Sequence, residues 1–122
     1  MRQTNRKTTM KQINAYIQPH KLSAVTRALH HVEGMTGVSV FEVRGFGRGR
    51  AKDSPHRITE DLVDYIPHVK IEAVVEDVLV DRVVEVIRRE AYTGLRGDGK
   101  IYVAPIEDAV RISTGERGEA AV

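Results

Sequence analysis

The segment 93–100 of this chain has the sequence Thr-Gly-Leu-Arg-Gly-Asp-Gly-Lys, with three glycines, an aspartate and two cationic side chains. Glycine accommodates positive φ and lets the backbone approach a ligand closely. The N–H groups of such a loop, followed by a lysine, can bind phosphate oxygens. The spacing is not that of a Walker loop, because Lys100 begins an apolar strand rather than a helix. An ordinary helix-to-strand turn, in which Gly94 ends the helix in a left-handed conformation, is the alternative.

Histidines are the other side chains that could do chemistry, and they favour a metal site only weakly. The chain has five: His20, His30, His31, His56 and His68. His30 and His31 are adjacent in the sequence and point to different sides of a helix, so they cannot chelate a metal as an i,i+4 pair does. A site shared by His20 and His68, both near predicted strand ends, stays open. A small enzyme or a metal-binding module therefore stays open as an alternative to phosphate binding at the glycine loop.

Composition bounds the class of protein. The chain has 122 residues, 41% hydrophobic and 30% charged, which is typical of one soluble globular domain. Its net charge of +2 is too small to indicate nucleic-acid binding. It has no cysteine, which excludes a disulfide framework and fits the cytoplasm. No apolar run approaches the roughly 20 residues that span a bilayer, so we expect no membrane insertion. Residues 1–9 are basic and polar, and we expect a disordered leader before a domain at 10–122.

The hydrophobic period alternates between that of a strand and that of a helix in a regular order. It predicts strands at about 12–17, 38–43, 69–75 and 101–103 and helices at 22–32 and 77–91. Asp77 is the predicted N-cap of the second helix, and Glu85 and Arg89 are a predicted i,i+4 ion pair. Periodicity is lost between the two halves, which predicts a flexible loop at about 46–66. Ile106, Val110 and Ile112 predict a further short strand.

These elements predict an α+β ferredoxin-like sandwich. The order is strand-helix-strand, long loop, strand-helix-strand (βαβ-βαβ), with both helices on one face of an antiparallel sheet. The other face is predicted to carry a mixture of polar and aromatic side chains: Asn14, Tyr16, Lys70, Glu72 and Tyr102. Such a face is either solvated or buried against another subunit.

The chain resembles the PII signal-transduction (nitrogen regulatory protein P-II) family over nearly its whole length. The resemblance rests on several motifs in the right order and at the right distances. They are 43–48 (Val-Arg-Gly-Phe-Gly-Arg), 69–72 (Val-Lys-Ile-Glu), Thr93-Gly94 with 97–101 (Gly-Asp-Gly-Lys-Ile), 114–116 (Thr-Gly-Glu) and 120–122 (Ala-Ala-Val).

This resemblance implies a homotrimer that binds ATP or ADP in clefts between subunits and acts as a regulatory protein, not an enzyme. The long loop would contact a target membrane transporter or metabolic enzyme. The implied cofactor-binding residues are Ser39, Gly45, Gly47, Arg48, Glu72, Gly97, Asp98, Gly99, Lys100 and Arg111. Backbone amides, a lysine and an arginine suit phosphate. For the two residues near the adenine, Ser39 and Glu72, the alternative is an ordinary strand position.

Departures from the family pattern predict a divergent member. Ser113 replaces a second phosphate-contacting arginine, which leaves AMP as an alternative nucleotide. Gly49 and His68 replace a glutamine and a lysine that hold Mg²⁺ and 2-oxoglutarate in the family. We therefore expect no usual 2-oxoglutarate site, while Mg²⁺ remains compatible with ATP. Leu95 stands where the family often has a lysine, and Asp61 occupies the place of the tyrosine that some bacterial members have uridylylated.

Overall fold

The computed structural model describes residues 9–45 and 66–122. Residues 1–8 of the predicted leader and residues 46–65 of the predicted loop lie outside these ranges. So do two of the predicted site residues, Gly47 and Arg48. Those predictions stay predictions.

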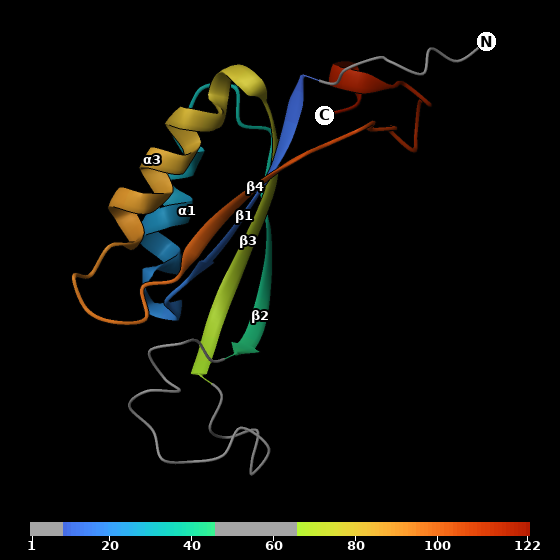
Figure 1. Cartoon of the computed structure of the whole chain (residues 1–122). Helices are drawn as coiled ribbons and strands as arrows, with labels where there is room; N and C mark the ends of the chain where they lie inside the picture. Colours follow the sequence, from blue (N-terminus) through green and yellow to red (C-terminus); the bar gives the residue numbers. More distant parts are fainter. Residues whose placement is uncertain (1–8, 46–65) are drawn as a thin grey trace.

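The described residues form a four-stranded sheet in the order β2-β3-β1-β4, and each pairing is antiparallel. The strands are β1 (Met10–Ile17), β2 (Ser39–Gly45), β3 (Ile66–Glu76) and β4 (Lys100–Pro105). The helices are α1 (Leu22–His30) and α3 (Val80–Ala91). Figure 1 shows both helices on the same side of the sheet. This arrangement confirms the predicted α+β ferredoxin-like sandwich.

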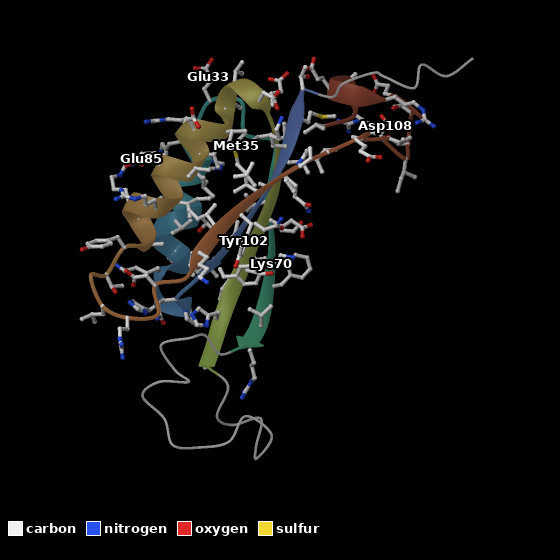
Figure 2. The ribbon with its side chains drawn as sticks, in the orientation of Figure 1. Glu33, Met35, Lys70, Glu85, Tyr102 and Asp108 are labelled. Atoms are coloured by element: carbon white, nitrogen blue, oxygen red, sulfur yellow. The ribbon has the colours of Figure 1, made fainter. Side chains whose placement is uncertain are left out.

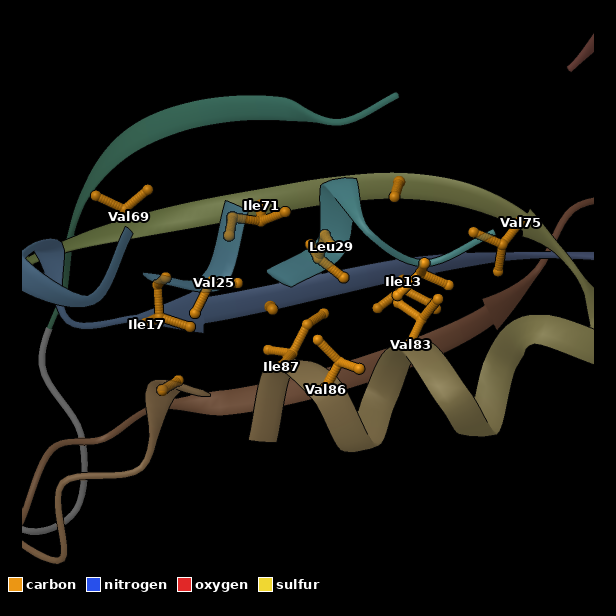
Figure 3. Packing of buried hydrophobic residues seen from close by; sticks show 14 residues of the cluster. Ile13, Ile17, Val25, Leu29, Val69, Ile71, Val75, Val83, Val86 and Ile87 are labelled. Atoms are coloured by element: carbon orange, nitrogen blue, oxygen red, sulfur yellow. The ribbon is translucent and has the colours of Figure 1, made fainter. Parts of the chain in front are cut away.

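The core lies between the helices and the two central strands. Alternate side chains of β1 and β3 point into it, because successive residues of a strand face opposite sides. Figure 3 shows these side chains meeting those of the helices. The buried residues are Ile13, Ala15, Ile17, Val25, Leu29, Val32, Val69, Ile71, Ala73, Val75, Val83, Val86, Ile87 and Ala91. Each large aliphatic side chain in this set contributes about 1.5–3 kcal/mol by burial.

The start and the charged face of the second helix differ from the prediction. Asp77 does not cap α3: it begins a short 3-10 turn, η3 (Asp77–Leu79), and its carboxylate accepts a hydrogen bond from Lys11 Nζ at 2.6 Å. The predicted pair of Glu85 with Arg89 is also wrong. Glu85 pairs with Arg88 at 3.5 Å, and Arg89 pairs with the neighbouring Glu90. In both cases the carboxylate binds a nearby cation that the local sequence pattern did not single out: Lys11, from β1, binds Asp77, and Arg88, three residues along α3, binds Glu85.

Two predicted chain ends also need correction. α3 ends at Ala91 in an extended residue, Tyr92, so the left-handed glycine cap proposed for Gly94 does not occur. Gly94 does have positive φ, +81°, but two residues beyond the helix cap. The segment after Pro105 forms an isolated bridge between Val110 and Arg117 and a 3-10 turn, η4 (Gly118–Ala121), instead of the predicted strand. In the ranges 9–45 and 66–122, no helix is long and apolar enough to cross a membrane.

Candidate phosphate site at the glycine loop

The glycine loop, residues 92–99, joins the end of α3 to the start of β4 at one end of the sheet. Gly94, Gly97 and Gly99 have φ of +81°, +84° and +105°, which L side chains rarely adopt. Gly99 also lies against β1, where an added Cβ would stand 1.6 Å from the backbone oxygen of Tyr16. This close approach follows from the register, in which Tyr16 is opposite Lys100. The loop can therefore reach β4 only with glycine at position 99.

Asp98 closes the loop on itself. Its carboxylate accepts hydrogen bonds from the hydroxyl of Thr93, from the Thr93 N–H at 3.0 Å and from the Gly94 N–H at 3.3 Å. The Thr93 hydroxyl is the main reason why the pKa of Asp98 lies below its ordinary value, and the charge of Lys21 lowers this pKa further. Asp98 is therefore ionised at neutral pH, and its side chain organises the loop.

The carbonyl oxygen of Gly97 ties the loop to two other elements. Gln18, in the turn after β1, donates Nε2–H to this oxygen at 2.5 Å. His68, near the start of β3, has Nε2 at 3.3 Å from the same oxygen. The sequence did not indicate a role for Gln18 or Lys21, and it included Thr93 in the loop without its bonds to Asp98. The signal for Gln18 was available, since antiparallel pairing of β1 with β4 brings the end of β1 beside the residues before Lys100.

The predicted adenine contacts lie farther along the sheet. Ser39 and Glu72 are directly opposite each other in the pairing of β2 with β3, so the structure brings these two together. Their face points away from the helices. There Glu72 forms an ion pair with Lys70 at 3.2 Å. This pair supports the alternative in which Glu72 is an ordinary charged strand residue and not an adenine contact. Gly45 is opposite Ile66, at the end of the sheet where β3 starts.

Arg111 lies away from the glycine loop within one chain. The loop precedes β4 and Arg111 follows it, and Figure 1 shows the loop and the C-terminal segment at opposite ends of the molecule. The guanidinium is held in its own segment, with Nε 3.7 Å from the Glu116 carboxylate and Nη2 3.5 Å from the Val122 carbonyl oxygen. A single chain therefore does not assemble the predicted set of residues.

The metal alternative gains no geometric support from the described residues. Within 9–45 and 66–122, no three or more histidine, cysteine, aspartate or glutamate side chains are grouped so that they could hold a metal ion. His68, one of the two histidines considered for a shared site, lies beside a backbone carbonyl of the glycine loop. His56 lies outside the described residues.

The fold and this loop define a small ferredoxin-like domain with an organised glycine loop at one end of its sheet. Comparison with known proteins gives the family. The family model described as "Nitrogen regulatory protein P-II" matches residues 10–116. The chain belongs to this family of regulatory signalling proteins, and it is a regulator rather than an enzyme, as the resemblance implied.

Individual relatives agree with this assignment. The nitrogen regulatory protein P-II of Azospirillum brasilense is 50% identical over 113 residues, which are 93% of this chain and 100% of that protein. Nitrogen regulatory protein P-II 1 of Escherichia coli (strain K12) is 49% identical over the same shares. Among solved structures, Arabidopsis thaliana PII bound to citrate is similar with a TM-score of 0.74 and 35% identity, and 94% of each chain is covered.

Proposed function

We propose that this protein binds ATP and ADP between the subunits of a cytoplasmic homotrimer. Its long loop then signals the nucleotide state to a membrane transporter or a metabolic enzyme. The observation that carries the proposal is the glycine loop, in which Gly97 and Gly99 have positive φ and Gly99 directly precedes Lys100. A backbone fixed in this way, beside a lysine, suits the charge and the close approach of phosphate oxygens.

The position of Arg111 supports a site between subunits. An arginine can bind phosphate oxygens bidentately, but this one lies beyond the far end of β4 from Lys100. In a ring of subunits, the C-terminal segment of one chain could reach the glycine loop of the next. Its pairing with Glu116 is partly exposed, so phosphate can replace that partner at small cost.

The face of the sheet opposite the helices supports self-association. Lys70 and Tyr102, both labelled in Figure 2, lie on this face, and each is near the ring of Tyr16. The Lys70 ammonium lies 5.5 Å from the centre of the Phe41 ring and 5.9 Å from that of Tyr16. Phe41 and Tyr102 are 45% and 54% exposed. Aromatic side chains gathered on one exposed face are typical of a surface that another subunit covers.

Calorimetric titration with ATP, ADP and AMP, with and without Mg²⁺ and 2-oxoglutarate, tests the binding proposal. We expect micromolar binding of ATP or ADP at up to three sites per trimer, with AMP as the alternative nucleotide and Mg²⁺ as a partner of ATP. We expect no response to 2-oxoglutarate, because Gly49 and His68 replace its usual ligands. Citrate is a useful further arm, since a relative was solved with it. Absence of nucleotide binding would overturn the proposal.

Mixed trimers test whether the site lies between subunits. Lys100→Ala and Arg111→Ala should each weaken ATP binding strongly as homotrimers. After the two variants are unfolded and refolded together, some clefts would combine an intact Lys100 with an intact Arg111 of the neighbour. We then expect a fraction of wild-type sites to return. If no tight site returns although mixed trimers form, both residues act within one chain or not at all.

A further inference from the structure

We infer that Gln18 positions the glycine loop by holding the Gly97 carbonyl oxygen, which His68 also approaches. Through this contact, Gln18 sets the affinity of the loop for nucleotide phosphates. The inference rests on the proposed function and deepens it. Gln18 lies at the β1–α1 turn, outside the loop, and its Nε2–H group donates to the Gly97 carbonyl oxygen at 2.5 Å. His68 Nε2 approaches the same oxygen at 3.3 Å from the opposite element, β3.

Two sets of hydrogen bonds restrain the glycine loop. One set lies within the loop, and the other, which includes the bond from Gln18, joins the loop to the rest of the domain. The internal restraint is the Asp98 carboxylate, which binds Thr93 and the N–H of Gly94. It closes the loop on itself but does not fix the loop against the sheet. The bond from Gln18 fixes the peptide between Gly97 and Asp98 against the turn that follows β1. Because a trans peptide is planar, holding this carbonyl oxygen also sets the direction of the N–H on its other side.

Such a restraint matters most next to glycine. Gly97 and Gly99 populate both signs of φ easily, so their peptides are free to rotate unless something holds them. A ligand that needs these N–H groups in one direction would otherwise bear the entropy of ordering them. The cost falls on phosphate binding and not on the folded core, because Gln18 is outside the buried cluster.

The experiment compares Gln18→Met with Glu33→Met. Methionine keeps the length of glutamine and removes the donor. Glu33 is exposed in the segment that follows α1, away from the turn that holds Gln18 and outside the open face of the sheet. For each trimer we would measure ATP affinity, thermal unfolding without nucleotide, and hydrogen exchange of the amides of residues 97–99. In Gln18→Met we expect about tenfold weaker ATP binding and faster exchange at these amides, with an unchanged unfolding midpoint. Glu33→Met should match the wild type.

A rescue variant separates positioning from a general structural role. Gln18→Lys restores a donor of sufficient reach, so slow exchange of the loop amides should return without nucleotide, where the added charge cannot attract phosphate. Wild-type ATP affinity in Gln18→Met would overturn this inference and leave the proposed function standing. So would a loss of affinity that accompanies a lower unfolding midpoint and that Gln18→Lys does not restore. Failure of the wild-type protein to bind ATP or ADP would overturn the proposed function and this inference together.

Discussion

At the scale of single residues, the glycine loop contains one side chain that holds the loop together and other groups that are candidates for binding a ligand. The motif matches a phosphate-binding pattern, and Asp98 stands in its centre. The Asp98 side chain, however, is bonded to Thr93 and to the N–H of Gly94 within the same loop. Its negative charge would repel phosphate if it were free. It stabilises the loop, and the phosphate binding that we propose falls to the backbone amides and the cations.

The charge of Asp98 should make loop stability depend on pH. The pKa of this carboxyl is below its unfolded value of 3.8, chiefly because of the Thr93 hydroxyl. Its contribution is therefore present above the unfolded pKa and is lost as pH falls through the folded pKa. Asp98→Asn should lower the free energy of unfolding by at most about 1 kcal/mol at pH 7, because water screens the partly exposed carboxylate, and by less at pH 3. Chemical denaturation at equal protomer concentration measures this difference. An equal difference at both pH values would contradict it.

Gly99 should tolerate no side chain. An added Cβ would stand 1.6 Å from the Tyr16 backbone oxygen, and the residue has φ of +105°. Gly99→Ala must move either the loop or β1, at a cost of roughly 3 kcal/mol or more in unfolding free energy. Gly37→Ala is the matched control, because nothing lies within 4 Å of its added Cβ, and it should stay within about 0.5 kcal/mol of the wild type. Similar unfolding midpoints for the two variants would refute the close approach.

At the scale of elements, β1 and β3 do most to form the core. They are the central pair of the sheet, and their alternating side chains meet the buried stripes of α1 and α3 (Figure 3). In α3 the buried side chains are Val83, Val86, Ile87 and Ala91, whereas Val80 and Val84 are only partly buried. Which valine lies deepest depends on how the helix axis rests on the sheet, and periodicity does not determine that.

A pair of valines tests the orientation of α3 and the turn before it. Val83 in α3 is 0% exposed, whereas Val78 in η3 is 84% exposed. Val83→Ala should reduce the free energy of unfolding by about 2–3 kcal/mol, through lost burial and the cavity left behind. Val78→Ala, which removes the same atoms, should change it by less than about 0.5 kcal/mol. Thermal unfolding of both variants compares them directly. A larger effect at Val78 would mean that this turn is buried in the assembled protein.

At the scale of the whole molecule, the candidate phosphate-binding residues lie at opposite ends of one chain. The glycine loop is at one end of the sheet, and the C-terminal segment after β4, which contains Arg111, is at the other (Figure 1). Between them lies the open face with Phe41, Tyr16 and Tyr102. Tyr16 and Tyr102 pack edge to face, with ring centres 6.1 Å apart. This combination of a divided site and an aromatic face is what a site shared between subunits requires.

Charge on the open face should break the proposed trimer. Tyr102→Asp places a carboxylate where a second subunit would bury it, which costs several kcal/mol per interface. Light scattering after gel filtration should give three times 13.6 kDa for the wild type and 13.6 kDa for the variant. Ser23→Asp, on the exposed side of α1, should remain trimeric. A wild-type mass of one chain, or a trimeric Tyr102→Asp, would contradict the role of this face.

Hydrophobic periodicity was enough to predict the order and kind of the four strands and two helices. Several motifs at fixed distances identified the family, and the three glycines of 93–100 with Lys100 predicted a phosphate-binding loop, which stays a prediction. Local patterns failed where side chains choose among nearby partners: Asp77 binds Lys11 instead of capping α3, and Glu85 binds Arg88.

Tertiary structure alone decided how the candidate site is built. Gln18 and Gly97 are 79 residues apart in the chain and meet because β1 pairs with β4. Lys100 and Arg111 are close in the sequence, yet an extended strand holds them apart. Distance along the chain predicts neither result, because a sheet joins segments that are remote in sequence and a strand separates those that are near.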